Sequence, residues 1–173
     1  MLNLQLRYSN MEDSAILNQW LDDEENWPYF PIGSQKEAAV FAYNWIGFSK
    51  YKASLTCLLN NQVVAIGTIF LMPYKKVSHS PLFYLIVDKQ KRGQGIGTNL
   101  LKNLLNLAEK YFHLEALIAE VYQGSQLISL LKKDKFQQFA FQENYIKDVG
   151  NKKNPYLARI LFQRFLKKSK KEA

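Results

Sequence analysis

Cysteine is nearly absent from this chain, which restricts both its covalent framework and its metal chemistry. The single cysteine among 173 residues, Cys57, excludes an intrachain disulfide and a metal site built from cysteines. It lies in the apolar run Leu55–Leu59, which is typical of an ordinary core thiol. Histidine is also scarce, since His79 and His113 are the only two and stand far apart. We therefore expect no dedicated metal site.

Long hydrophobic runs are missing as well. No apolar stretch approaches the roughly 20 residues of a membrane-spanning helix. The segment Met1–Arg7 has no basic start followed by an apolar core, as a signal peptide would have. We expect no membrane partner and no export signal, so the cytoplasm is the expected location.

Acidic residues are scarce relative to basic ones, 15 against 23, and the net charge is +8. Such a charge suits nucleic acid or an acidic small ligand. Much of it lies in Lys167–Lys171, which we interpret as part of a solvated tail. Because no interleaved basic–aromatic motif and no helix-turn-helix signature is present, nucleic-acid binding ranks last among the functions considered.

Apolar residues, by contrast, are abundant. They make up 47% of the chain, and aromatic residues make up 14%, which is enough for a real hydrophobic core. We find no linker and no internal repeat. The expected organisation is one domain, residues 1–166, followed by a basic C-terminal tail, residues 167–173.

The most informative stretch runs from Leu82 to Tyr111. Leu82–Val87 is an apolar run rich in aromatic and β-branched residues, which predicts a buried strand. Arg92–Thr98 (RGQGIGT), here called the glycine turn, follows after a short polar segment. One apolar helix face comes next, formed by Leu100, Leu101, Leu104, Leu105, Ala108 and Tyr111.

A glycine turn between a strand and a helix is suited to holding phosphate. Glycines adopt positive φ and allow close approach of a ligand, and the first helical turn has free N–H groups and the positive end of the helix dipole. Lys89, Lys91 and Arg92 add positive charge beside it. Thr98 breaks both the P-loop pattern and the dinucleotide fingerprint.

The pattern that does fit is [QR]-x-x-G-x-[GA], met by Arg92–Gly97. With its strand before and its helix after, it resembles the acetyl-coenzyme A (acetyl-CoA) site of the GNAT family of N-acetyltransferases. The other interpretation is a glycine-rich turn without a ligand. The resemblance implies that the strand splays from its neighbour at a bulge and pairs its main chain with the pantetheine arm, with the N–H of Val87 near the thioester oxygen. The cofactor-binding residues it implies are Leu85, Ile86, Val87, Arg92, Gly93, Gln94, Gly95, Ile96, Gly97 and Thr98.

The remaining periodicities agree with this resemblance. We predict an α/β fold with a mixed, mostly antiparallel central sheet flanked by helices and containing one splayed parallel strand pair, as in GNAT proteins. The predicted strands are 2–6, 54–59, 63–72, 82–87, 116–121, 136–141 (continued at 145–146) and 156–165. Besides the helix after the glycine turn, helices are predicted at 9–21, from the capping box Ser34–Glu37 to about residue 50, and from Gly124.

Acetyl transfer to an amine needs a base, because an ammonium group has no lone pair. Glu120, in Ala119-Glu120-Val121, is similar to the glutamate of a Leu-Glu-Val motif in bacterial enzymes that acetylate the N-terminal alanine of a ribosomal protein, where it acts as base. The other interpretation is a strand-end residue or a partner for a lysine. Tyr84 and the carboxylates of Asp22–Glu25 are the fallback bases.

Asp22–Gly33 joins four acidic residues to three aromatic ones, and two interpretations of it stay open. In the resembled family this region often lines the acceptor site, where carboxylates and aromatic rings would favour a cationic acceptor. Otherwise it is a solvated loop with its rings packed onto the body.

Three positions depart from the family pattern. Gly124 or Ser125 replaces an asparagine, Leu131 replaces a tyrosine that protonates the leaving thiolate, and Lys135 replaces a glycine. The expected function is transfer of acetyl from acetyl-CoA to a primary amine, on a protein N-terminus or a small molecule, by direct attack on the thioester. The alternative is a catalytically degenerate acyl-CoA-binding module. The acceptor and the oligomeric state stay open, a homodimer included.

Overall fold

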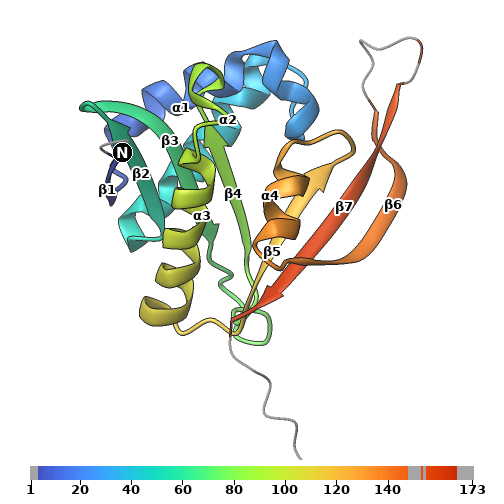
Figure 1. Ribbon diagram of the computed structural model, residues 1–173. Helices are drawn as coiled ribbons and strands as arrows, with labels where there is room; N and C mark the ends of the chain where they lie inside the picture. Colours follow the sequence, from blue (N-terminus) through green and yellow to red (C-terminus); the bar gives the residue numbers. More distant parts are fainter. Residues whose placement is uncertain (1–3, 148–152, 154, 167–173) are drawn as a thin grey trace, which may run out of the picture.

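The computed structural model describes residues 4–147, 153 and 155–166, and within these a seven-stranded sheet forms the centre (Figure 1). The strand order is β1-β2-β3-β4-β5-β7-β6, and all neighbours are antiparallel except β4 and β5. The mixed, mostly antiparallel sheet predicted from the sequence is thereby confirmed. The strands are β1 Leu4–Tyr8, β2 Ser54–Leu59, β3 Gln62–Phe70, β4 Leu82–Val87, β5 Ala116–Tyr122, β6 Gln137–Lys147 and β7 Tyr156–Phe165.

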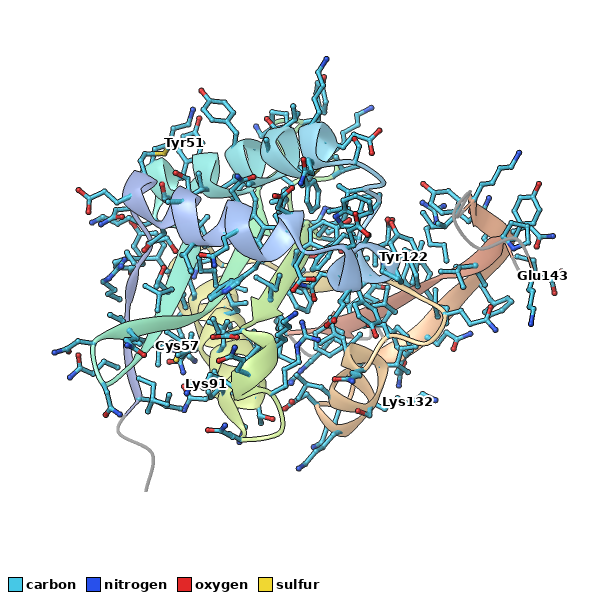
Figure 2. All side chains as sticks on the ribbon, turned by 90° about the horizontal axis from the view of Figure 1, so that it is seen from above. Tyr51, Cys57, Lys91, Tyr122, Lys132 and Glu143 are labelled. Atoms are coloured by element: carbon cyan, nitrogen blue, oxygen red, sulfur yellow. The ribbon has the colours of Figure 1, made fainter. Side chains whose placement is uncertain are left out.

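Helices cover both faces of the sheet, as Figure 2 shows from above. α1 (Ser14–Asp22) and α2 (Gln35–Ile46) lie on one face, and α3 (Ile96–Asn106) and α4 (Leu127–Lys133) lie on the other. The face under α1 and α2 is rich in aromatic side chains, whereas the face under α3 and α4 is mainly aliphatic. The aromatic members are Trp20, Trp27, Tyr29, Phe30, Phe41, Trp45, Phe70 and Tyr84.

α3 packs directly over a glycine of β3, Gly67. A Cβ atom on Gly67 would stand 2.6 Å from Cδ1 of Leu104 and 3.2 Å from Leu100, so a larger residue would force these two α3 side chains to shift. The helix ends in a wide π-helical turn, Leu107–Tyr111. This turn departs from the 3.6-residue period, and Tyr111 is 52% exposed. The prediction that Tyr111 lies on the apolar face of the helix is therefore wrong.

The first helix also differs from its prediction in detail. A 3₁₀ turn, Met11–Asp13, precedes α1. The Asn10 side chain caps it by accepting from the amide of Asp13, whose carboxylate accepts from the amide of Asn10. The same buried carboxylate receives both terminal nitrogens of Arg7, at 2.8 and 2.7 Å. α1 is thus anchored to β1 at its start.

The parallel pair opens after two residues, which confirms the predicted splay. Pairing joins Leu82 to Ile118 and Phe83 to Ala119, and β4 and β5 then diverge (Figure 1). The bulge expected in β4 is absent, because β4 keeps a regular register with β3 as far as Val87. The opening arises instead because β4 follows β3 while β5 stays paired with β7.

Candidate functional site

A cavity of about 470 Å³ lies where β4 and β5 diverge. One part, the turn half, is lined by the end of β4, the glycine turn, the start of α3 and one side of α4. The other, the aromatic half, is lined by Asn26, Tyr29, Phe30, Tyr84 and Glu120. Every residue of the cofactor set predicted from the sequence lines the turn half except Gln94.

The glycine turn needs its glycines for their backbone conformation. Gly93 has φ 75° and Gly95 has φ 81°, values that side chains with a Cβ rarely adopt. A Cβ at either position would meet no heavy atom within 4 Å, so both residues face open space that a ligand can enter. Gly97 differs, because a Cβ there would make ordinary contacts with Val87 and Leu130.

The start of α3 is left free for an anion. Gly95 occupies the N-cap position and supplies no side-chain hydrogen bond, and the amide of Asn99 is bonded to the Gly95 carbonyl. The amides of the first turn, from Ile96 to Thr98, therefore lack a capping side chain, which is the arrangement that binds phosphate at a helix N-terminus.

The main chain of β4 turns alternate residues toward the opening. The amide of Asp88 bonds to the carbonyl of Val64 on β3. Since antiparallel residues alternate in direction, Ile86 also faces β3, whereas Leu85 and Val87 direct their N–H and C=O groups toward β5. Of the three β4 residues predicted to pair with a ligand, Leu85 offers both main-chain groups and Val87 offers its N–H, since its C=O accepts from Arg92. Ile86 offers neither.

The basic side chains of this region have separate roles. Lys89 forms ion pairs with Asp23 at 2.6 Å and Glu25 at 3.2 Å. Arg92 donates to the side-chain oxygen of Asn26 at 2.6 Å and to the carbonyl of Val87 at 3.2 Å. The charge expected beside the glycine turn is thus partly engaged by the segment after α1.

Lys91 lines the cavity. Its amide donates to the carbonyl of Asp88, but its side chain makes no hydrogen bond or ion pair with any residue in the described part of the chain. Figure 2 shows it near the start of α3. Its side chain is therefore a cation, just before the glycine turn, that is free to meet a ligand in the turn half.

Glu120 enters the aromatic half from β5. Ala119 and Val121 pack into the aliphatic cluster, so Glu120 and Tyr122 lie on the opposite face of the strand. The Glu120 side chain is 12% exposed. The Tyr122 hydroxyl donates to its Oε1 at 2.6 Å, and Nη1 of Arg159 donates to its Oε2 at 3.3 Å.

Both tyrosines near Glu120 hold their protons tightly. Burial raises the pKa of Tyr122 well above its ordinary value, and its hydrogen bond to Glu120 raises it further. Burial likewise raises the pKa of Tyr84, and the nearby charge of Glu120 adds to this. The two phenols are therefore neutral proton donors at neutral pH.

Arg159 itself is held by the β6–β7 hairpin. Its Nη2 donates to Gln142 at 2.8 Å, and its guanidinium lies 4.0 Å from the ring centre of Tyr145. Sequence reasoning missed Arg159 because it is 39 positions from Glu120. The pairing of β5 with β7, which sets Tyr122 opposite Arg159, is the signal that would have found it.

The segment Asp22–Gly33 combines features of both of its interpretations. It contains a 3₁₀ helix, Glu24–Tyr29, here called the 24–29 segment. Tyr29 and Phe30 line the cavity, as the first interpretation predicted, but none of the carboxylates of Asp22–Glu25 does. Lys89 engages two of these carboxylates, so the segment gives the cavity aromatic surface and no negative charge.

Leu131, which stands where the resembled family has a proton-donating tyrosine, is fully buried in the aliphatic cluster. The side of α4 that lines the cavity carries Leu127, Leu130 and Lys133 instead. At the other departing position Ser125 lines the cavity, while Gly124 has φ 90° in the turn before α4.

Within residues 4–147, 153 and 155–166, no group of three or more His, Cys, Asp or Glu side chains is placed to hold a metal ion. No helix in the same part of the chain is long and apolar enough to cross a membrane.

A parallel strand pair that opens beside a phosphate-binding type of turn is an arrangement suited to an extended phosphorylated ligand between two strands. The profile of the Acetyltransferase (GNAT) family matches residues 17–133, and the chain belongs to this family. A search of curated proteins found no match.

Solved structures agree with this fold. A ribosomal-protein-alanine N-acetyltransferase from Brucella melitensis is 20% identical, with a TM-score of 0.74, and the match covers 93% of this chain and 99% of that one. A Salmonella typhimurium protein solved with its cofactor acetyl-CoA is 16% identical, with a TM-score of 0.74 and 96% of each chain covered. A GNAT acetyltransferase from Streptococcus pneumoniae is 18% identical, with a TM-score of 0.71 and 94% and 99% covered. At these identities the likeness concerns the fold.

Proposed function

We propose that this protein is an acetyl-CoA-dependent N-acetyltransferase that acts on a primary amine. The observation that carries the proposal is one continuous cavity that joins the glycine turn, through the open β4–β5 pair, to Glu120. Such a cavity can hold a phosphorylated thioester at one end and an amine at the other.

The turn half fits acetyl-CoA in each of its parts. The free amides from Ile96 to Thr98 and the unpaired Lys91 suit the pyrophosphate. The main chain of Leu85 and Val87 suits the pantetheine arm, and the N–H of Val87 is the donor for the thioester oxygen. Acetyl-CoA supplies an activated acetyl group, and the chain's part is to hold that group still beside the acceptor.

Glu120 is the proposed base, because it is the only carboxylate among the described residues that line the cavity. It takes a proton from the acceptor ammonium, directly or through one water, and leaves a neutral amine to attack the thioester carbon. Tyr122 and Arg159 fix its two oxygens. Tyr84 does not serve as the fallback base, since its raised pKa keeps it protonated.

The leaving thiolate receives no proton from α4 at the position of Leu131, which is buried in the core. A thiol of this kind has a pKa of about 8.5 by analogy with cysteine, so it leaves as a thiolate and takes its proton from solvent.

The aromatic half indicates the kind of acceptor. Tyr29, Phe30 and Tyr84 offer flat walls around a single carboxylate, which suits one primary amine on a compact, largely apolar body. A protein N-terminus and a small monoamine both meet this description. A polyamine or an aminoglycoside would bring further cations to a cavity that offers them no further carboxylate.

The test is release of the coenzyme A thiol with a panel of N-terminal peptides, small monoamines, polyamines and aminoglycosides, beside calorimetry of acetyl-CoA binding. We expect binding, and turnover with a peptide or a monoamine. Binding without turnover on any amine would overturn the proposal in favour of a non-catalytic acyl-CoA-binding module. We further propose that residues 1–166 suffice, so that deletion of the basic tail 167–173 leaves acetyl-CoA affinity unchanged. That tail lies outside the described residues.

A further inference from the structure

Side chains of the turn half reach across to the segment that forms the wall of the aromatic half. Arg92 donates to Oδ1 of Asn26 at 2.6 Å, and Lys89 pairs with Asp23 and Glu25. These contacts connect positions more than 60 residues apart. They place one side of the glycine turn against the 24–29 segment.

Asn26 is the central element of this connection. It is only 3% exposed, and both ends of its amide are used. Its nitrogen donates to the carbonyl of Trp20 on α1 at 2.7 Å, while its oxygen accepts from Arg92. Because a buried amide costs free energy when it lacks a partner, losing Arg92 would leave the Asn26 oxygen unsatisfied and loosen this segment.

The segment held in this way continues directly into the cavity wall. Tyr29 and Phe30 line the aromatic half, and the Phe30 ring centre lies 6.4 Å from that of Tyr84. Arg92 also donates to the carbonyl of Val87, the last residue of β4. One guanidinium therefore contacts both the edge proposed to hold the thioester and the segment that carries the acceptor wall.

We propose that Arg92 is a positioning residue for the acceptor amine, acting through Asn26, with Lys89 as an outer support. Arg92 belongs to the glycine turn, but its side chain supports the aromatic half and does not bind the phosphates of acetyl-CoA. This inference rests on the proposed acetyltransferase function. Lys91, the residue just before Arg92, supplies the matched comparison, because it lines the cavity and leaves its charge for the ligand.

The experiment compares Arg92→Gln with Lys91→Gln in the full chain, using steady-state kinetics for both substrates and calorimetry for acetyl-CoA. Arg92→Gln should raise KM for the amine about tenfold, or about 1.4 kcal/mol, and change acetyl-CoA affinity by less than about twofold. Lys91→Gln should weaken acetyl-CoA binding about tenfold and change the amine KM by less than about twofold. Arg92→Lys should restore little of the wild-type amine KM, since an ammonium group lacks the forked guanidinium that reaches both the Val87 carbonyl and the Asn26 oxygen. If Arg92→Gln weakens acetyl-CoA binding as Lys91→Gln does and leaves the amine KM unchanged, the inference is overturned.

Hydrogen exchange decides the same question without turnover. The amides of residues 24–30 should exchange faster in Arg92→Gln than in Lys91→Gln, and equal exchange in the two variants would overturn the inference. If the wild type acetylates no amine, the proposed function fails, while the exchange result still shows whether Arg92 holds the 24–29 segment.

Discussion

The two halves of the cavity are assembled in different ways. The turn half is mostly one continuous stretch, residues 82–98, in which strand, turn and helix follow one another. The aromatic half draws on the connection between α1 and α2, on β4 and β5, and through Arg159 on β7. A co-substrate shared by a whole family can be held by a local motif. An acceptor in the aromatic half would instead meet side chains that only the sheet brings together.

Their electrostatics differ as well. The turn half presents main-chain amides and Lys91, which suit a polyanionic ligand. The aromatic half presents one carboxylate, Glu120, with a hydrogen bond on each oxygen. Changes in one half should therefore alter acetyl-CoA affinity, and changes in the other should alter chemistry at the amine. Two variants test this difference, and two further measurements test the ionisable groups around the aromatic half.

The largest expected effect is that of Glu120→Gln. Removal of a positioned base typically costs roughly 10²–10⁴ in rate, so kcat/KM should fall by that order at neutral pH while acetyl-CoA affinity stays nearly intact. The deficit should shrink as pH rises toward the acceptor's own pKa, because the amine then arrives neutral. Glu115→Gln, an exposed carboxylate just before β5, is the control. A pH–rate profile that overlays the wild type would remove Glu120 from the mechanism.

The next effect is in the turn half. Gly95→Asp should weaken acetyl-CoA binding at least tenfold, about 1.4 kcal/mol. The substitution places a negative charge beside the first-turn amides of α3, where the phosphate is proposed to bind. Gly95→Asn is the matched variant, since both residues tolerate positive φ and only the charge differs. Calorimetry on the two folded variants measures the difference. Equal affinities would mean that no anion binds beside Gly95.

A smaller effect concerns the phenols beside Glu120. Tyr84 and Tyr122 should ionise well above the ordinary tyrosine pKa of about 10. Folding strengthens their hold on the proton, so their contribution to the free energy of unfolding is complete below pH about 10 and falls as pH rises further. In Glu120→Gln both pKa values should drop, though not to the ordinary value, since burial remains. Absorbance titration of tyrosinate measures this. An unchanged titration would mean that Glu120 does not influence the pKa values of these two phenols.

The smallest effect should come from Asp23→Asn. The hydrogen bond from Lys89 lowers the pKa of Asp23, and the amide of Glu25 lowers it further. The contribution of this pair is therefore present at neutral pH and is lost as pH falls through the folded-state pKa. Asparagine keeps the cap on Glu25, so only the ion pair is lost. Because Lys89 is exposed and Asp23 is partly exposed, the drop in Tm should be slight and should vanish at high salt. A drop that persists in salt would indicate lost packing instead.

Local patterns predicted much of this fold. β2, β4 and β7 have the predicted bounds, because the alternation and apolar runs that mark a strand depend on residues a few positions apart. The helices differ from their predictions in detail. The predicted first and second helices include 3₁₀ segments at Met11–Asp13 and Gly47–Tyr51.

The candidate site likewise has features that local sequence determines and features that only the tertiary structure determines. Sequence alone determined the glycine turn, its place between a strand and a helix, and Glu120 as a carboxylate within a buried strand, since each depends on neighbours in the chain. Only the tertiary structure decided that Arg159 and Tyr122 hold Glu120 and that Arg92 turns to Asn26. It also decided that Lys89 engages the carboxylates expected to face the acceptor, and that Leu131 is a core residue. These pairings depend on strand register and on which helix covers which face, because the interaction between two charged groups depends on the distance between them and not on their separation along the chain.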